Sequence, residues 1–125
     1  MKQKKSTEDY LKTIYLLSRQ GGVHGAAIAE SLKVSRPTVS VALKALAQEG
    51  YVWMDKSRLV YLTDTGFQLA KEIYERHQTF QELLVSLGVD RETAAHDACE
   101  MEHSVGPESF AAIKRVLERI QETDM

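Results

Sequence analysis

Residues 26–50 contain two short helical patterns joined by a tight turn, and this arrangement limits the fold more than any other feature of the chain. Residues 26–32 predict a short helix, and a three-residue connection leads into the next pattern. There Ser35 is placed to cap a second helix whose first turn contains Pro37, a position that tolerates a missing N–H. Gly50 ends that helix. Two short helices joined this closely predict a helix-turn-helix.

The outward face of the second predicted helix carries small and basic side chains. Acidic residues are absent from it until Glu49, so the face lacks the mixed charge of an ordinary surface helix. Such a face lets the backbone approach a major groove while hydroxyls and cations meet phosphates. The alternative is a helical hairpin that only builds a core. The residues predicted to contact DNA on this helix are Ser35, Arg36, Pro37, Thr38, Ser40, Val41 and Lys44.

Residues 51–54 and 59–62 are two β-rich runs separated by a polar, basic tetrapeptide, which predicts a hairpin. A hairpin directly after a recognition helix is a wing, and Lys56 and Arg58 at its tip would reach flanking phosphates. The alternative is a plain hairpin that covers the core with Trp53 and Tyr61.

Three further segments show helical periodicity, so the predicted fold is mostly α with a small β-wing. The first helix is expected at residues 6–19, with Ser6 as its cap and an apolar stripe of Tyr10, Leu11, Ile14 and Leu17. A long helix is expected from about residue 63 to 87, with a seam of Ala70, Ile73, His77, Phe80, Leu84 and Leu87. The last helix is expected to start at Gly106-Pro107, with a stripe of Phe110, Ile113, Leu117 and Ile120.

The octapeptide from His96 to His103 is dense in side chains that ligate metals. Asp90 is placed to cap a helix that would carry it. In that helix Cys99, Glu102 and His103 share one face, and they supply thiolate, carboxylate and imidazole. The alternative is a solvated acidic helix whose cysteine is a small core residue.

Two polar residues elsewhere have ordinary structural explanations when each is taken alone. His77 interrupts an apolar seam, where a histidine is usually a hydrogen-bonded core residue. Asp9 stands in the first turn of its helix, where a carboxylate favours the helix dipole.

Charge divides the chain into two halves. Residues 1–60 hold ten Lys or Arg against five Asp or Glu, a net of +5, whereas residues 61–125 hold six against thirteen, a net of −7. This asymmetry suggests a phosphate-binding lobe and a cation-binding lobe, although chance segregation would produce it too. The 125 residues contain one cysteine, no membrane-length apolar window and no signal-peptide pattern, so we expect a cytoplasmic protein.

The order of elements and several short motifs resemble a known family. The motifs are Glu8-Asp9-Tyr10-Leu11-Lys12-Thr13-Ile14-Tyr15, Ile28-Ala29-Glu30, Val34-Ser35, Pro37-Thr38-Val39-Ser40, Leu62-Thr63, Gly66, Arg76-His77, and Asp97-Ala98-Cys99 followed by Glu102-His103. Together they resemble the metal-dependent repressors of the diphtheria toxin repressor and manganese transport regulator family, in the short form without an SH3-like third domain. The resemblance extends over nearly the whole chain.

The resemblance implies a winged helix-turn-helix DNA-binding domain at residues 1–63 and a helical metal-binding and dimerisation domain at residues 64–125. It implies Asp9, Cys99, Glu102 and His103 as metal ligands, with His77 nearby. The expected cofactor is Mn²⁺ or Fe²⁺, and Zn²⁺ or Co²⁺ could bind in vitro. The expected protein is a homodimer that binds a two-fold symmetric operator as a repressor of metal-uptake genes, not an enzyme, with no membrane and no small-molecule substrate.

Two positions depart from the family pattern. Lys12 stands where manganese-type members commonly carry a Glu, so the number of metals per subunit stays open. Gln81 stands where iron-type members carry a further carboxylate. The choice between Mn²⁺ and Fe²⁺, the operator sequence and the sign of regulation also stay open.

Two other functions fit parts of the pattern. The first is a winged-helix regulator without a regulatory metal, which responds to a small ligand or uses Cys99 as a redox sensor. The second is a metallohydrolase with Zn²⁺ bound by Cys99, Glu102 and His103, a function that leaves the helix-turn-helix without a use.

Overall fold

The computed structural model describes residues 5–18 and 21–123, which form two compact units, residues 1–72 and 73–125. Each unit is described by itself. The predicted end of the first helix at residue 19 lies outside the described residues.

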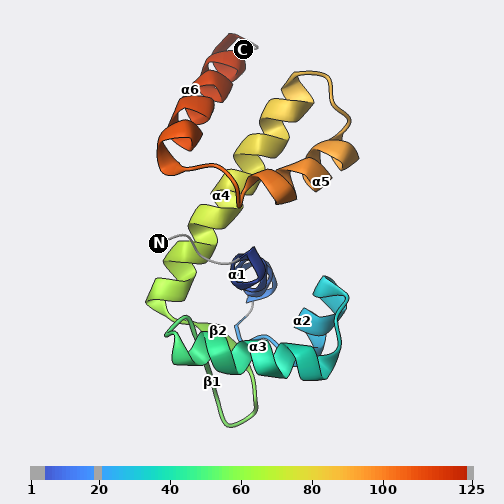
Figure 1. Ribbon diagram of the computed structural model, residues 1–125, viewed down its shortest axis with the longest axis vertical. Helices are drawn as coiled ribbons and strands as arrows, with labels where there is room; N and C mark the ends of the chain where they lie inside the picture. The colour runs from blue at the N-terminus through green and yellow to red at the C-terminus, as the bar shows by residue number, and fades with distance from the viewer. Residues whose placement is uncertain (1–4, 19–20, 124–125) are drawn as a thin grey trace. The chain divides into compact units, whose positions relative to one another are not determined.

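The first unit contains a helix-turn-helix followed by a β-hairpin, as the sequence predicts (Figure 1). Lys33 turns the chain between the two helices in the left-handed conformation (φ 59°), and the Ser35 side chain accepts a hydrogen bond from the Thr38 amide as the cap of the second helix. The elements are α1 (Lys5–Leu17), α2 (Gly25–Leu32), α3 (Arg36–Gln48), β1 (Val52–Met54), β2 (Val60–Leu62) and the first part of α4 (Asp64–Ser86).

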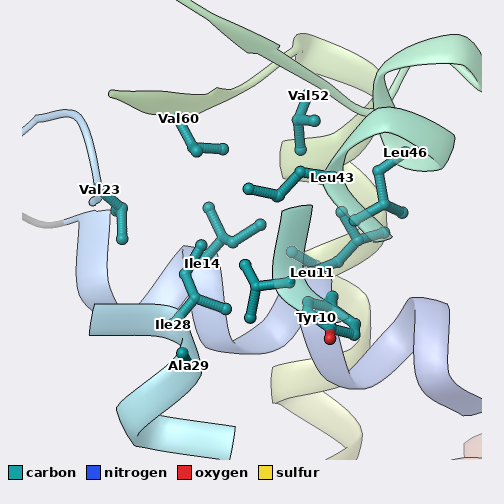
Figure 2. Packing of buried hydrophobic residues seen from close by; sticks show 12 residues of the cluster. Tyr10, Leu11, Ile14, Val23, Ile28, Ala29, Leu43, Leu46, Val52 and Val60 are labelled. Carbon is teal, nitrogen blue, oxygen red and sulfur yellow. The ribbon is translucent and has the colours of Figure 1, made fainter. Parts of the chain in front are cut away.

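The core of this unit joins α1, α2, α3 and the hairpin (Figure 2). Leu11 and Ile14 of α1 are completely buried, and Ile28 of α2 and Val60 of β2 meet them there. Burying one such side chain contributes about 1.5–3 kcal/mol. The inward positions predicted for α3, Val39, Leu43 and Leu46, are all buried.

The hairpin is tied to the rest of the first unit by a short backbone bridge. Its strands pair antiparallel, with Val52 opposite Leu62. On the other side of β2, Val23 and Val60 exchange backbone hydrogen bonds of 2.9 and 2.8 Å. No sequence pattern predicts this bridge, because a single paired residue has no alternation of apolar and polar side chains.

The second unit consists of the rest of α4, α5 (Arg91–Met101) and α6 (Pro107–Thr123). Phe80 is completely buried and meets the ring of Phe110 edge-on, with 5.7 Å between centroids. Ala94 and Ala98 of α5 are also buried, since small side chains allow close helix packing. Among the described residues of the whole chain, no helix has the length and apolarity that a membrane crossing requires.

Several predicted details were wrong. Ser6 lies inside α1, which begins at Lys5, so it is not the cap. Leu17 and Leu87, predicted to face inward, are 41% and 66% exposed because each lies where its helix is ending. The alternative in which Trp53 covers the core is not supported either, because Trp53 is half exposed and stacks on Tyr61, with 4.5 Å between ring centroids.

Gly66 allows the start of α4 to approach the end of the helix-turn-helix. A Cβ atom at this position would stand 2.0 Å from the carbonyl oxygen of Tyr51. That carbonyl accepts a hydrogen bond from the Thr63 amide, and the Thr63 hydroxyl donates to the Gly50 carbonyl. The contact involves backbone on both sides, so no side chain can move to relieve the clash.

We therefore expect Gly66→Ala to lower the free energy of unfolding of the first unit by about 2 kcal/mol, the usual cost of forced overpacking. Urea titration followed by circular dichroism measures it. The matched control is Gly25→Ala, where the nearest atom stands 3.9 Å from the added Cβ. The control should change stability by less than about 0.5 kcal/mol. Equal effects of the two substitutions would contradict the proposed close approach.

Candidate functional site

The metal-ligating residues of the second unit lie at the end of α5 and in the turn that follows. Asp90 caps α5 as predicted, and its hydrogen bonds with the Thr93 amide and hydroxyl hold the pKa of its carboxyl below the ordinary value. The helix ends at Met101, with Glu102 as C-cap and His103 beyond it. The predicted helix therefore ends at Met101, so Glu102 and His103 follow it in a turn instead of continuing its face.

The local backbone nevertheless gathers these side chains. The Glu102 amide continues the helical hydrogen-bond pattern to the Ala98 carbonyl at 3.0 Å, whereas the His103 amide bonds to the Glu100 carbonyl at 3.4 Å. The second bond joins residues three positions apart instead of four, as in a 3₁₀ helix, so the last turn is tighter than an α-helical one.

Glu102 is the centre of the group. One carboxylate oxygen, Oε2, lies 3.3 Å from Nδ1 of His77, and the other, Oε1, lies 3.3 Å from Nε2 of His103. Nδ1 of His77 also lies 3.7 Å from Sγ of Cys99. A carboxylate, two imidazoles and a thiol thus meet within the second unit.

Burial makes a negative charge on the Glu102 carboxylate energetically costly. The Glu102 side chain is completely buried, and the His103 side chain is only 6% exposed. A carboxylate removed from water needs cations or hydrogen-bond donors around it, since an isolated buried charge is very costly. Protonated imidazoles or a bound cation can supply that compensation.

The donor set fits one divalent transition metal. One donor atom from each of His77, Cys99 and Glu102 can be chosen so that all three lie within 4.8 Å of one another. Two ligands of one tetrahedral ion stand roughly 3.3–3.8 Å apart, given metal–ligand distances of about 2.0–2.3 Å. A mixed sulfur, nitrogen and oxygen set suits transition metals rather than Mg²⁺ or Ca²⁺.

Arg76 holds the turn that follows these ligands, a role that the sequence analysis missed. Its guanidinium donates a hydrogen bond to the Val105 carbonyl and lies over the Phe110 ring, 5.0 Å from the centroid. The contact joins α4 to the connection between α5 and α6. The only sequence signal was its place beside His77.

Asp9 is the remaining predicted ligand, whereas His96 and Gln81 are polar residues of the second unit that were not predicted to bind the metal. Asp9 lies on α1 in the first unit and is partly buried, and its membership of the metal centre stays a prediction. His96 is exposed and contacts only the neighbouring Asp97 in the described contacts, at 3.3 Å, so it stands apart from the cluster. Gln81 lines, with His77, an open pocket of about 470 Å³.

The predicted DNA-contacting residues all lie on exposed positions of the first unit. Val41, an apolar residue of this set on α3, is 71% exposed, whereas Val39, Leu43 and Leu46 of the same helix are buried. Ser35 and Thr38 also bond to each other at 2.8 Å, so these hydroxyls build the helix start as well as facing solvent. Lys56 and Arg58 stand at the tip of the hairpin.

Asp55 organises this tip, which the sequence analysis did not foresee. Its Oδ1 accepts hydrogen bonds from the amides of Ser57 and Leu59, both at 2.9 Å, and its Oδ2 accepts the Tyr61 hydroxyl at 3.2 Å. Arg58 adopts a positive φ of 65° inside this turn. The carboxylate therefore sets the backbone that carries the two basic side chains.

Two models of one protein family match this chain, one in each part. The family model described as "Iron dependent repressor, N-terminal DNA binding domain" matches residues 3–60. The model described as "Iron dependent repressor, metal binding and dimerisation domain" matches residues 63–124.

Individual relatives agree with these matches. The transcriptional regulator MntR of Salmonella typhimurium is 42% identical over 106 residues, covering 84% of this chain and 68% of the relative. The diphtheria toxin repressor of Corynebacterium diphtheriae is 33% identical over 117 residues, covering 92% of this chain and 52% of the relative.

A solved manganese-dependent transcriptional repressor in complex with manganese superposes with a TM-score of 0.81 at 32% identity. The match covers 90% of this chain and 52% of that structure. The chain thus spans about half the length of that solved relative.

The role of Asp55 can be tested without any ligand. In Asp55→Ala the amides of Ser57 and Leu59 should exchange with solvent at least about 10-fold faster, because each loses its acceptor. Burial, together with the hydrogen bond and charge of Asp55, raises the pKa of Tyr61 above its ordinary value. That pKa should fall in the variant, and NMR on ring-labelled tyrosine measures it. Ser57→Ala keeps the backbone donor and should leave both observables unchanged, whereas an equal response would remove Asp55 from this role.

Proposed function

Because this chain belongs to the family of iron-dependent repressors, matched in both its DNA-binding and its metal-binding regions, we propose that it is a Mn²⁺- or Fe²⁺-responsive transcriptional regulator. The observation that carries the proposal is the group formed by His77, Cys99 and Glu102, three kinds of donor close enough to share one ion. In this proposal the metal-bound homodimer binds a two-fold symmetric operator and represses genes for metal uptake.

DNA binding is assigned to α3 and the hairpin. The exposed face of α3 presents hydroxyls, small side chains and the cations Arg36 and Lys44, which suits insertion into a major groove. Lys56 and Arg58 would hold the flanking backbone from the wing. In a homodimer two such faces would read half-sites about 34 Å apart.

Metal binding is assigned to Cys99, Glu102 and His103, with His77 beside them and Asp9 as the ligand from the first unit. A divalent ion, when bound, supplies a compact positive charge that several anionic donors can share. Cys99 would bind as thiolate and the histidines as neutral imidazoles, so affinity should weaken as pH falls. Glu102 would exchange its histidine contacts for the ion.

The participation of Asp9 would make the site a switch. Asp9 belongs to the unit with the recognition helix, whereas the other donors belong to the dimerisation region. Arrangements in which Asp9 completes the donor set bind more tightly, and a ligand shifts a population only through such a difference in affinity. A complete shift from 1:99 to 99:1 needs about 5.5 kcal/mol of differential binding.

The types of donor atom limit which metals the site can bind. A thiolate favours softer ions, and affinity at such sites rises from Mn²⁺ through Fe²⁺ to the later metals of the row. Zn²⁺ and Co²⁺ would therefore bind in vitro whichever of Mn²⁺ and Fe²⁺ serves in the cell.

The proposal also bears on the other functions considered. A hydrolase with the same three residues would leave the exposed basic face of α3 unused, so we propose no enzymatic activity. Family membership likewise favours a metal over a thiol oxidation signal at Cys99. A protein that binds operator DNA must be in the same compartment as the chromosome, so we propose that this protein is cytoplasmic.

Cys99→Ala and His103→Ala should each reduce metal-stimulated operator affinity by at least about 100-fold, because a lost ligand removes the affinity difference that drives the switch. Fluorescence anisotropy with labelled operator, with and without Mn²⁺, measures this, and size-exclusion chromatography checks that the dimer persists. His96→Ala is the matched control, since this exposed histidine lies on the same helix outside the cluster. A full metal response in both ligand variants would place the regulatory site elsewhere.

Arg36→Ala and Lys44→Ala should weaken operator binding and flatten its dependence on salt. Each phosphate contact contributes about 0.9 to the slope of log affinity against log salt, so one lost contact in each subunit of the dimer reduces the slope by about 1.8. Lys71→Ala is the control, an exposed lysine of α4 in the same unit. Slopes identical to that of the control would exclude Arg36 and Lys44 from the interface.

A further inference from the structure

A groove of about 540 Å³ runs over the first unit between α3, the hairpin and the start of α2. Its polar lining consists of Arg36, Ser40 and Lys44 from α3, Arg58 from the wing and His24 from the segment before α2. None of the ten residues that line it, all in the described part of the chain, is acidic. The groove is therefore a cationic channel built by three separate segments.

His24 lines this groove but belongs to neither α3 nor the wing, the two elements to which DNA binding is assigned. It stands at the N-cap position of α2 with extended backbone (φ −75°, ψ 140°), yet its side chain makes no capping hydrogen bond. The side chain is exposed. Since serine, threonine, aspartate and asparagine are preferred at this position, histidine offers no advantage as a cap.

The neighbours of His24 leave room for a ligand backbone. Gly25 and Ala26 follow it at the start of α2 and line the same groove. Small residues here allow close approach of another chain, and the cations opposite would attract a negatively charged one. A DNA strand, with one negative charge per nucleotide, matches both properties.

We propose that the groove seats one strand of the operator backbone and that His24 donates a hydrogen bond to a phosphate in it. This inference rests on the proposed function and adds a contact from outside α3 and the wing. In helix-turn-helix proteins the first helix of the motif crosses the DNA backbone, which is the position of α2 and its preceding residue. An imidazole carries at least one N–H donor whatever its protonation state.

The strand is thereby held from two sides. Arg36 and Lys44 contact it from the recognition helix, and His24 contacts it from the first helix of the motif. Phosphate contacts fix the register of a protein on the duplex without reading sequence. His24 is thus a positioning residue for the recognition helix, and it affects affinity uniformly across operator sequences.

The test uses a two-fold symmetric duplex selected from random-sequence DNA with the Mn²⁺-loaded wild-type protein. His24→Ala should weaken binding by at least about 10-fold, because each subunit loses a hydrogen bond to a charged group. Phosphate ethylation interference should lose one phosphate position per half-site and keep the others. His24→Arg should restore both the affinity and that interference position.

Two controls separate this contact from folding and from metal binding. His96→Ala removes an exposed histidine from the second unit and should leave affinity and interference pattern unchanged. Mn²⁺ affinity and thermal unfolding of His24→Ala should equal those of wild type.

The outcomes distinguish the inference from the function on which it rests. Wild-type protein that binds no DNA with Mn²⁺ would overturn both. Metal-dependent binding by wild type, together with unchanged affinity and a complete interference pattern for His24→Ala, would overturn the His24 contact alone.

Discussion

The burial of the Glu102 carboxylate is the constraint on which the second unit depends. A charge without solvent must be compensated locally, and the chain provides His77 and His103 at 3.3 Å, one on each oxygen. Cys99 completes the surroundings on the side of His77. Such a group is expensive as a purely structural feature, because apolar residues of the same volume would be at least as stable. A bound cation would offset that cost.

In the first unit, the packed core holds basic side chains in fixed positions on the surface. The core formed by α1, α2 and α3 fixes the recognition helix, and the bridge between Val23 and Val60 ties the hairpin to it. Asp55 then shapes the hairpin tip, so Arg58 lines the same groove as Arg36 and Lys44. Precise placement matters because phosphate contacts orient the recognition helix.

Much of the fold could be predicted because its signals are local. The Ser35 cap, the Asp90 cap and the buried stripe of α3 depend on residues three or four apart, and each was confirmed. Errors arose where an element meets solvent. Leu17 and Leu87 fit the apolar spacing of their helices but are exposed, because each lies at the end of its helix. Apolar spacing does not show where the packing of a helix ends. The Val23 bridge and the Asp55 turn depend on single long-range or side-chain hydrogen bonds, which leave no periodic trace.

For the metal centre, the sequence by itself determined which donors are present and that three of them lie within five residues of one another. It also determined the basic face of α3, because charge and helical spacing are properties of a single segment. Tertiary structure decided that His77, 22 positions before Cys99, lies 3.7 Å from it. It also decided that Glu102 and His103 reach the cluster from a tightened turn rather than from a helix face. The first fact is a contact between two helices, which the spacing of residues within either helix does not encode, and the second is a change of backbone hydrogen bonding at the end of α5.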